Sequence, residues 1–578
     1  MPNELPYTEL TDEVTRNLAQ MCSENVRRYP DVLVYCQKNQ ANEYEGITWT
    51  TLYDEILNIA WNLRRAGVTS GTKVILYCPN SLDMLRAELA IMASGAIAVP
   101  IFAYFKMNTA ALLINHSDAE YIILAGQYQI NELHAVLPKI RTVWSFDHVT
   151  YSGPHLVRDF SELLVQRQDN SFTLSSDANP NDVCLNMYTS GTMGIPKCVQ
   201  LTHRNILSQQ AAIRSVLDIT KNDRFLSYLP WHHSFGGIFE LFSALYNGAT
   251  YHLESSLGKD ASSIISNWNI VHPTVFYSVP KIYQSLIEIA SSNQEASKTL
   301  FDTGLRFVFS AASSLSKRLS DEFTSRKIKV IEGWGLTETS PCCTITNPAV
   351  EREPGVVGLP IPGVRVRIAD DGEVQVSGPN VMVKYYNNDV ANADAFCEDG
   401  WYRTGDVGAI TPNGLKLITR KDRIFKLSNG EKVIPTDLER AIELKCHYVQ
   451  YTVVAGNGED FPVALIFPNR RLLDNPDLSI SPEQGCACPR NLSEFGKCLT
   501  TCLQNANLSI GQKFAKIKMA AIIDDELSID NSMLTPSMKV APKNVIEKYK
   551  AHLSILYGNH TPADEEVYVV EMNPYLFR

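Results

Sequence analysis

The sequence lacks the features that mark several classes of protein. It has no run of about 20 apolar residues and no basic-then-apolar start, so it predicts neither a membrane span nor a secretory signal. Its 52 Lys and Arg residues are outnumbered by 63 Asp and Glu residues, and the net charge of −11 argues against a nucleic-acid-binding surface. Internal repeats and long low-complexity tracts are also missing.

A disulfide framework is missing as well. The 13 cysteines are odd in number and scattered, which fits a protein of the reducing cytoplasm. Cys486, Cys488, Cys498 and Cys502 form one cluster, but their separations match no common zinc ribbon or finger. Cys498 and Cys502 are four residues apart on a predicted helix, where small buried residues are common. Metal binding by this cluster is therefore the less favoured interpretation.

The length and the pattern of segments predict a multidomain α/β protein. A single core rarely exceeds roughly 300 residues, so a chain of 578 residues implies two or more domains. Strand-like and helix-like segments alternate through the first 420 residues, which is typical of α/β proteins. After Arg420 the sequence becomes richer in Lys and short loops. We therefore expect a boundary at Asp422, with domains 1–421 and 422–578.

Individual elements can be predicted where the pattern is clear. Residues 73–78 form a predicted buried strand, 81–94 a helix capped by Ser81, and 96–101 the next strand. Residues 364–376 alternate apolar and charged residues around an Asp-Asp-Gly turn. This pattern predicts a β-hairpin with one solvent-facing side.

A loop rich in small residues, 189–197, carries the first sign of chemistry. It follows the predicted strand 183–188 and precedes the strand 198–201, after which Thr202 is placed to cap a helix. Glycines in such a loop let backbone N–H groups approach phosphate oxygens, hydroxyls add donors, and a lysine adds positive charge. The residues concerned are Thr189, Ser190, Gly191, Thr192, Gly194 and Lys197. From composition alone, a flexible surface loop is an equally good interpretation, and the loop lacks the Walker pattern.

This loop resembles the signature of the adenylate-forming superfamily, which includes acyl-CoA synthetases, luciferases and the adenylation domains of peptide synthetases. The family usually has Thr at the position of Met193 and Gly at that of Cys198. Further segments resemble the other family motifs in the expected order. Residues 229–236 are similar to the segment that gates the acyl pocket, with His233 at the aromatic or histidine position. Residues 310–315 resemble the adenine-side segment, which contributes Ser313.

Residues 332–338 are close to another family pattern. The resemblance implies that Trp334 packs against adenine beside Gly335, that Thr337 binds the α-phosphate, and that Glu338 binds Mg²⁺ together with Thr192. A carboxylate suits a hard cation and an indole offers a flat face, so the chemistry agrees. Without the other motifs, Trp334 in the core and Glu338 at the start of a helix would be the simpler interpretation.

The resemblance continues to the end of the chain. It implies that Asp406 and Arg420 bind the ribose hydroxyls and that Asp422 is a hinge. Lys539, within Leu-Thr-Pro-Ser-Met-Lys, is implied to bridge the substrate carboxylate and the α-phosphate. The resemblance also implies that Lys426 and Gly430 lie on the side that binds coenzyme A. After Lys539 the family often has basic residues, whereas this chain continues Val-Ala-Pro-Lys.

The implied protein is α/β, with a large N-terminal domain of α/β subdomains, a small β-barrel-like part and a small mobile α+β C-terminal domain. The implied reaction converts a carboxylic acid and MgATP to acyl-AMP and pyrophosphate, and coenzyme A then forms a thioester. The resemblance is closest to long-chain fatty-acid–CoA ligases. Ser234 stands where amino-acid-activating relatives carry Asp, so an amino acid is not expected. Aromatic candidates for an apolar acyl pocket, each equally suited to ordinary core, are Trp231, Phe235, Phe239, Phe276 and Tyr277.

Two alternatives stay open at this point. In the first, the acyl group is delivered to a carrier-protein phosphopantetheine. The short segment between Glu338 and Gly358, however, leaves no room for the insertion that fatty-acyl-AMP ligases carry there. In the other, the protein is a silent relative that binds nucleotide or lipid. The acyl chain length, the oligomeric state, peripheral contact with a membrane and the role of the tail 559–578 are not predicted by the sequence.

Overall fold

The computed structural model divides the chain into two compact units. The first contains residues 1–404 with 409–416, and the second contains 405–408 with 417–578. The predicted boundary residue, Asp422, lies in the short helix η3 (Lys421–Arg423) of the second unit. The structure describes residues 3–11, 16–133, 137–174, 178–189, 196–311, 315–353, 355–475, 489–528, 531–535, 540–558 and 568–571.

The first unit contains an eight-stranded sheet in the order β19-β9-β8-β4-β3-β5-β6-β7. The strands from β8 to β7 in this order are parallel, and β9 pairs antiparallel with both β8 and β19. The predicted strands at 73–78, 96–101, 183–188 and 198–201 are confirmed. Its strands are β3 (Lys73–Tyr77), β4 (Ile97–Pro100), β5 (Tyr121–Leu124), β6 (Thr142–Ser145), β7 (Leu156–Asp159), β8 (Val183–Thr189), β9 (Lys197–Thr202) and β19 (Lys384–Tyr385).

A nine-stranded sheet follows in the same unit, in the order β16-β15-β14-β13-β12-β10-β11-β1-β2. Its strands are β1 (Leu33–Lys38), β2 (Tyr44–Thr48), β10 (Arg224–Ser227), β11 (Thr250–Leu253), β12 (Val275–Ser278), β13 (Phe307–Ser310), β14 (Lys329–Trp334), β15 (Thr344–Ile345) and β16 (Leu359–Pro360). Strands β10 to β14 are parallel, so their carboxyl ends lie at one edge. Three predicted motif segments follow directly after β10, β13 and β14, and such an edge is where α/β sheets commonly bind ligands.

Helices of the first unit begin and end where the sequence places caps. Ser81 caps α3 (Leu82–Ala93), as predicted, and Thr202 forms a capping box with Asn205 at the start of α7 (His203–Leu217). The other helices are α1 (Leu18–Arg28), α2 (Trp49–Arg65), α4 (Met107–Ser117), α5 (Gln127–Asn131), α6 (Ser161–Leu164), η1 (Phe235–Glu240), α8 (Leu241–Asn247), α9 (Ala261–Val271), α10 (Pro280–Ser292), α11 (Gln294–Phe301), α12 (Lys317–Thr324), η2 (Thr337–Thr339) and α13 (Asp389–Ala395).

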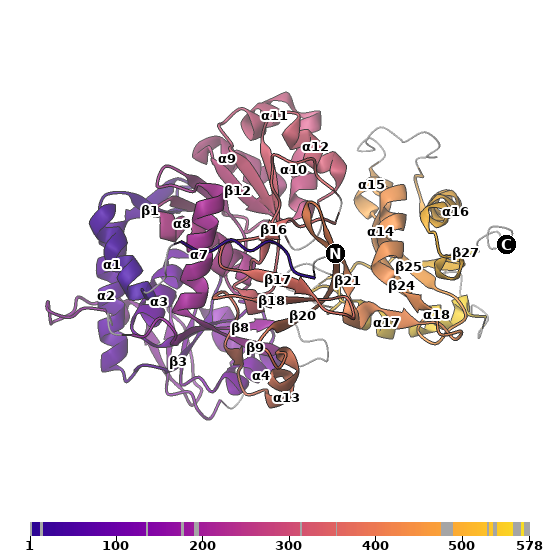
Figure 1. Ribbon diagram of the computed structural model, residues 1–578. Helices are drawn as coiled ribbons and strands as arrows, with labels where there is room; N and C mark the ends of the chain where they lie inside the picture. The colour runs from indigo at the N-terminus through magenta and orange to yellow at the C-terminus, as the bar shows by residue number, and fades with distance from the viewer. Residues whose placement is uncertain are drawn as a thin grey trace. The chain divides into compact units, whose positions relative to one another are not determined.

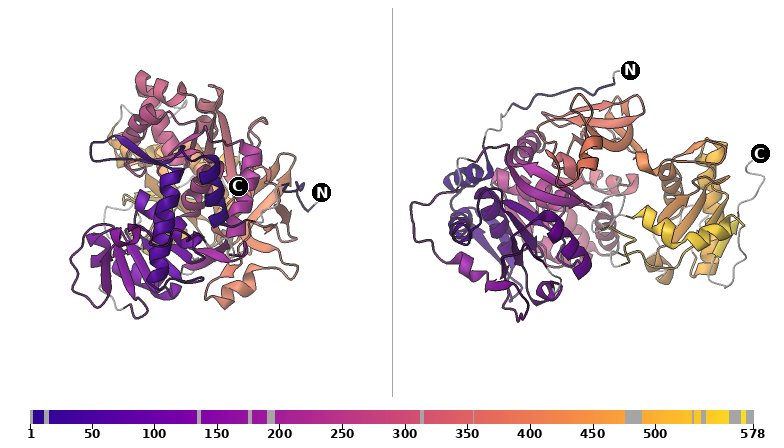
Figure 2. Two further views of the ribbon diagram at one scale, coloured as in Figure 1. Left: turned by 90° about the vertical axis from the view of Figure 1, so that its left-hand side faces the viewer. Right: turned by 90° about the horizontal axis from the view of Figure 1, so that it is seen from below.

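The small β part expected from the family is a four-stranded sheet in the order β17-β18-β20-β21. The predicted hairpin is confirmed as β17 (Arg365–Ile368) paired antiparallel with β18 (Glu373–Ser377). The predicted solvent-facing side is wrong for β18, because Glu373 and Gln375 are buried. The remaining strands are β20 (Tyr402–Thr411) and β21 (Gly414–Arg420). The N-terminal segment adds to β17, because Leu5 N donates to Val366 O at 2.9 Å and Ile368 N donates to Asn3 O at 2.7 Å. Figure 2 shows this indigo segment reaching the strands of the sheet.

The second unit is built on a four-stranded sheet, β24-β25-β26-β27, with helices on both faces (Figure 1). Alternate residues of β25 point to opposite cores: Ala464 and Ile466 pack with α14 and α16, while Val463 and Leu465 pack with α17 and α18. The elements are β22 (Phe425–Lys426), β23 (Lys432–Val433), α14 (Pro435–Lys445), β24 (Val449–Ala455), β25 (Val463–Pro468), α15 (Arg470–Asp474), α16 (Leu492–Ser509), η5 (Lys513–Ala515), β26 (Met519–Ile522), α17 (Pro542–Lys548), α18 (Lys550–Leu556) and β27 (Tyr568–Glu571).

Several expectations about the chain can now be compared with the fold. The α/β class with a large N-terminal part and a separate C-terminal part is confirmed. Strand β27 lies within the tail 559–578, whose role the sequence left open. Cys498 and Cys502 lie on α16, as predicted, whereas Cys486 and Cys488 are outside the described residues. No helix among the described residues is both long and apolar enough to cross a membrane.

The buried side-chain amide of Asn507 joins α16 to the backbone just before β26 in the second unit. Asn507 donates to Ile517 O at 2.8 Å and accepts from Ile517 N at 2.9 Å. Asn507→Ala leaves both backbone groups unpaired, so the stability of this unit is expected to fall by about 2–4 kcal/mol. Hydrogen–deuterium exchange of peptides from 510–522 measures the loss. Asn505→Ala, an exposed change on the same helix, is the control, and equal exchange in the two variants would contradict the prediction.

Candidate active site

The predicted phosphate loop connects two paired strands of the eight-stranded sheet. Thr189 at the end of β8 is the register partner of Lys197 at the start of β9, and its Oγ1 donates to Lys197 O at 3.5 Å. The two ends of the loop are therefore held together. The predicted residues Ser190, Gly191, Thr192 and Gly194 lie outside the described residues, as do Ser313 and Lys539.

Lys197 and Glu338 both contact Tyr385. The Lys197 Nζ lies 4.7 Å from the centroid of the Tyr385 ring, a cation–π geometry. The Tyr385 hydroxyl donates to Glu338 Oε1 at 2.7 Å and lies 3.2 Å from the Tyr402 hydroxyl. Strand β19 creates this arrangement because it pairs with β9 and brings Tyr385 back to the loop. The sequence analysis did not single out Tyr385, and no motif marked it.

Glu338 is held in a nearly buried position. It is only 8% exposed, and the backbone N–H of Met382 donates to its carbonyl at 2.8 Å. Gly335, three residues earlier, has no room for a side chain, since a Cβ there would lie 1.6 Å from Pro341 O. Trp334 is also 8% exposed at the end of β14. The predicted motif 332–338 is thus one tightly packed segment in which glycine is required.

The structure brings the gate segment and the phosphate-binding motif together. Ser234 Oγ lies 3.0 Å from Thr337 Oγ1, across about a hundred residues of sequence. The neighbouring His233 accepts a hydrogen bond at Nδ1 from Phe235 N at 3.3 Å. An accepting Nδ1 places the proton of a neutral imidazole on Nε2.

His232 differs from His233 in its surroundings. It is packed against the ring of Phe102 at 5.0 Å, and burial, together with the neighbouring His233, lowers its pKa to about 3. His232 is therefore neutral at physiological pH. In the part of the chain that the structure describes, no group of three or more His, Cys, Asp or Glu side chains is arranged to hold a metal ion.

The aromatic candidates for the acyl pocket separate into two groups. Phe235, Phe239 and Tyr277 belong to one buried cluster with Phe309, in which Phe239 and Phe309 lie 4.7 Å apart between ring centroids. The other two candidates, Phe276 and Trp231, pack against other aromatic residues. Phe276 packs on Trp268 at 4.8 Å, and Trp231 packs with Tyr35 and Tyr251. Among the described residues, the first group and Phe309 form one continuous aromatic cluster, here called the aromatic wall.

The predicted ribose and hinge residues are neighbours within the second unit. Arg420 Nη1 donates to Asp406 Oδ1 at 3.1 Å, and the Asp406 side chain is 13% exposed. Arg420 Nε also lies 3.9 Å from Asp422 Oδ1. Lys543, one of the residues after the catalytic-lysine motif, lies 3.8 Å from the other Asp422 oxygen. The predicted hinge residue thus contacts both a ribose candidate and the C-terminal segment.

Lys426 and Gly430 lie on the small hairpin β22–β23 of the same unit. The exposed Lys426 is at the end of β22, and its carbonyl accepts from Gly458 N at 2.8 Å. Gly430 has φ +84° and turns the chain toward β23, with no atom near the place of a Cβ. Both residues are accessible, which is what binding a large co-substrate requires.

Glu338 is chemically suited to hold a Mg²⁺ ion. Its carboxylate is nearly buried and receives a hydrogen bond from a neutral hydroxyl, and no lysine, arginine or histidine in the described residues forms an ion pair with it. A buried carboxylate without a protein cation favours a bound one. Because Mg²⁺ usually combines one or two carboxylates with water and substrate phosphates, a single protein carboxylate is enough.

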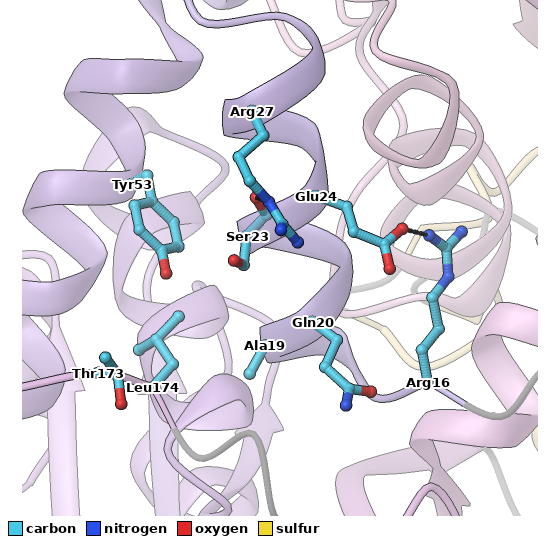
Figure 3. A pocket seen from close by; sticks show the side chains of 9 residues that line it. All are labelled: Arg16, Ala19, Gln20, Ser23, Glu24, Arg27, Tyr53, Thr173 and Leu174. Atoms are coloured by element: carbon cyan, nitrogen blue, oxygen red, sulfur yellow. Dashed lines mark hydrogen bonds and ion pairs between the residues drawn. The ribbon is translucent and has the colours of Figure 1, made fainter.

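A separate cleft of about 500 Å³ lies beside α1 and α2 (Figure 3). An ion pair between Arg16 and Glu24 forms one side of it, and the Tyr53 ring forms another. Its lining contains Arg16, Ala19, Gln20, Ser23, Glu24, Arg27, Tyr53, Thr173 and Leu174, none of which is a predicted site residue. The cleft is therefore not part of the candidate active site.

Two family models match most of this chain. Residues 22–386 match the family described as AMP-binding enzyme, and residues 422–561 match its C-terminal domain. The long-chain-fatty-acid–CoA ligase FadD15 of Mycobacterium bovis is 26% identical over 94% of this chain and 97% of its own. Long-chain-fatty-acid–CoA ligase 1 of Schizosaccharomyces pombe is 24% identical over 90% of this chain and 87% of its own.

Solved structures share the fold. The anthranilate CoA ligase AuaEII in complex with anthranoyl-AMP superposes with a TM-score of 0.76, at 19% identity over 94% of this chain and 99% of its own. Such a likeness concerns the arrangement of the elements. Because the first family match spans more than half of the chain, the chain belongs to the AMP-binding enzyme family, and the prediction of an adenylate-forming enzyme of the acid–thiol ligase type is confirmed.

Proposed function

We propose that this enzyme activates a medium- or long-chain fatty acid with MgATP and transfers the acyl group to coenzyme A. The observation that carries the proposal is the meeting of Lys197 and Glu338 at Tyr385, with Thr337 close by in the same motif. A cation and a carboxylate positioned together suit a polyphosphate and its metal ion. The relatives named as long-chain fatty-acid–CoA ligases support the choice of acid and acceptor.

The gate segment supports the choice of a fatty acid over an amino acid. An amino group would need a carboxylate partner, and Ser234, the residue after His233, is instead a neutral hydroxyl beside Thr337. The wall of Phe235, Phe239 and Tyr277 is apolar and buried. Burial of an alkyl chain contributes about 0.8 kcal/mol per methylene group, so an aromatic wall favours a lipophilic acid.

The proposed mechanism assigns one task to each group. Thr189 and Lys197 hold the pyrophosphate with the loop between them, and Thr337 donates to the α-phosphate. Asp406 accepts from the ribose hydroxyls, and Arg420, which donates to Asp406 at 3.1 Å, is the second ribose contact. Glu338 would hold Mg²⁺, which when bound neutralises phosphate charge. Lys539 stabilises the charge that builds on the α-phosphate as the carboxylate attacks it and pyrophosphate leaves.

The second half-reaction is proposed to use a different arrangement of the two domains, 1–421 and 422–578. Asp422 is the proposed hinge, and a swing about it removes Lys539 and presents Lys426 and Gly430 to coenzyme A. The thiol then attacks the acyl-adenylate, and AMP leaves. A holo acyl carrier protein is the alternative acceptor. The cytoplasmic location expected from the cysteines remains a prediction.

One assay tests the proposed activity. The protein is incubated with ATP, Mg²⁺ and a panel of fatty, aryl and short acids, with hydroxylamine as the trap. Hydroxamate with fatty acids is the expected result, and no hydroxamate with any acid would overturn the enzyme proposal. Repeating the reaction with coenzyme A or a holo carrier protein distinguishes the acceptors, since thioester with the carrier protein alone would contradict the coenzyme A assignment.

Lys539→Ala separates the two half-reactions. Because one transition-state charge contact is lost, acyl-AMP formation is expected to fall on the order of 10²-fold or more. Thioester formation from supplied acyl-AMP is expected to stay near the wild-type rate. Lys550→Ala is the control, because Lys550 is exposed and pairs only with Glu547 among the described residues. Equal loss of both steps would argue against two domain arrangements.

Glu338→Gln and Tyr385→Phe test the metal assignment as a pair. Glu338→Gln removes the charge that would hold the cation, so acyl-AMP formation is expected to fall about 10²-fold and to need more Mg²⁺. Tyr385→Phe removes only the hydroxyl and keeps the ring beside Lys197, so a loss below about 10-fold is expected. The rate is measured as a function of Mg²⁺ concentration. An unchanged Mg²⁺ dependence in Glu338→Gln would exclude Glu338 as the metal ligand.

A further inference from the structure

Glu240 is a fully buried acid to which the proposed reaction assigns no task. It is the last residue of the π-helix η1, which begins directly after Ser234. No ion pair to Glu240 is formed by any lysine, arginine or histidine within the described part of the chain. Burial raises the pKa of its carboxyl well above the ordinary range, against the opposing effect of the Ser227 hydroxyl. Burial therefore favours the protonated form of this carboxyl.

Glu240 ends a chain of hydrogen bonds, which we call the buried relay: Trp231, Tyr251, Ser227 and Glu240. The Trp231 indole N–H donates to Tyr251 Oη at 2.9 Å, and the Tyr251 hydroxyl donates to Ser227 Oγ at 2.7 Å. The Ser227 hydroxyl in turn donates to Glu240 Oε2. All four side chains are fully buried. An indole can only donate, so the direction of the relay is fixed and its last member must be an acceptor.

The buried relay connects the gate segment, 229–236, to the end of η1. Trp231 lies two residues before His233, and Glu240 lies at the far end of η1. Between them the backbone is packed on itself, because a Cβ on Gly237 would lie 2.0 Å from Trp231 O and Gly237 N donates to His233 O at 2.8 Å. A shift of Trp231 therefore moves the backbone that carries His233.

The same segment is held from a second side. A π-helix leaves carbonyls without their usual α-helical donors, and Gln210 of α7 donates to the Ile238 carbonyl at 3.0 Å. The Gln210 side chain also accepts from Ser243 on α8 at 2.9 Å. With both ends and the middle of the segment fixed, Ser234 is kept at 3.0 Å from Thr337.

We propose that Glu240 is a positioning residue, which closes the buried relay and so holds the gate segment in the conformation that brings His233 and Ser234 to Thr337. This inference rests on the proposed acyl-adenylate function for its kinetic consequence. Its structural part, the order of the segment 229–241, does not depend on that function. The role needs a neutral acceptor of the right length rather than a charge.

Two matched pairs of variants test the inference in the full chain. Glu240→Gln keeps a neutral acceptor for Ser227, whereas Glu240→Leu keeps the volume and removes the acceptor. Ser227→Ala interrupts the relay, whereas Ser278→Ala removes a buried serine at the matching end of β12, where it bonds the Tyr228 hydroxyl instead. We expect Glu240→Leu and Ser227→Ala to lower kcat of acyl-AMP formation by about 10- to 100-fold, with KM for ATP changed less than about 3-fold. Glu240→Gln and Ser278→Ala are expected to stay within about 3-fold of wild type.

A measurement that needs no activity accompanies the kinetics. Hydrogen–deuterium exchange of peptides covering 229–241 is expected to rise in Glu240→Leu and Ser227→Ala and to match wild type in the other two variants. If the wild-type protein forms no acyl-AMP but exchange follows this pattern, the proposed reaction fails and the positioning role stands. Wild-type kcat in Glu240→Leu, an equal loss in Glu240→Gln, or exchange that does not separate the pairs would overturn the inference.

Discussion

The arrangement of the active site depends on the buried amide side chains of α7. Asn205 donates to the carbonyls of Pro379 and Val381 at 2.8 and 2.9 Å, Gln209 accepts from Cys342 N at 2.8 Å, and Gln210 donates to Ile238 O. Each amide therefore binds the backbone of a different loop near a motif. Loops carry unpaired backbone groups that cannot be buried without such partners. One helix, which follows the phosphate loop and β9, thus supplies the common reference for segments from distant parts of the chain.

Much of this organisation is predictable from the sequence because it rests on short-range rules. Apolar runs bounded by turns predict the strands on either side of α3. Ser81 and Thr202 are at positions where a side chain can cap a helix. The order of the motifs along the chain is enough to indicate the family. The motif alone indicates a glycine at position 335. The structure supplies the physical reason, because the Pro341 carbonyl leaves no room for a Cβ there.

The remaining features depend on contacts that sequence distance hides. Tyr385 meets Glu338 because β19 returns to the edge of a sheet formed much earlier in the chain, and no local pattern encodes that pairing. Glu240 looks like an ordinary helix residue until its burial is known. The N-terminal segment pairs with β17 across more than 350 residues. In each case the register of a distant strand or the packing of a core decides the role of the side chain.

The place of Tyr385 has an electrostatic consequence. Lys197 lies against the face of its ring and Glu338 accepts from its hydroxyl, yet no ion pair joins the two charges among the described residues. The phenol is a spacer of low polarity between a cation and an anion that would otherwise neutralise each other. Both charges are therefore kept available for ligands of opposite sign, an anionic oxygen on one side and a divalent ion on the other. A single aromatic ring in this position keeps the two charges apart.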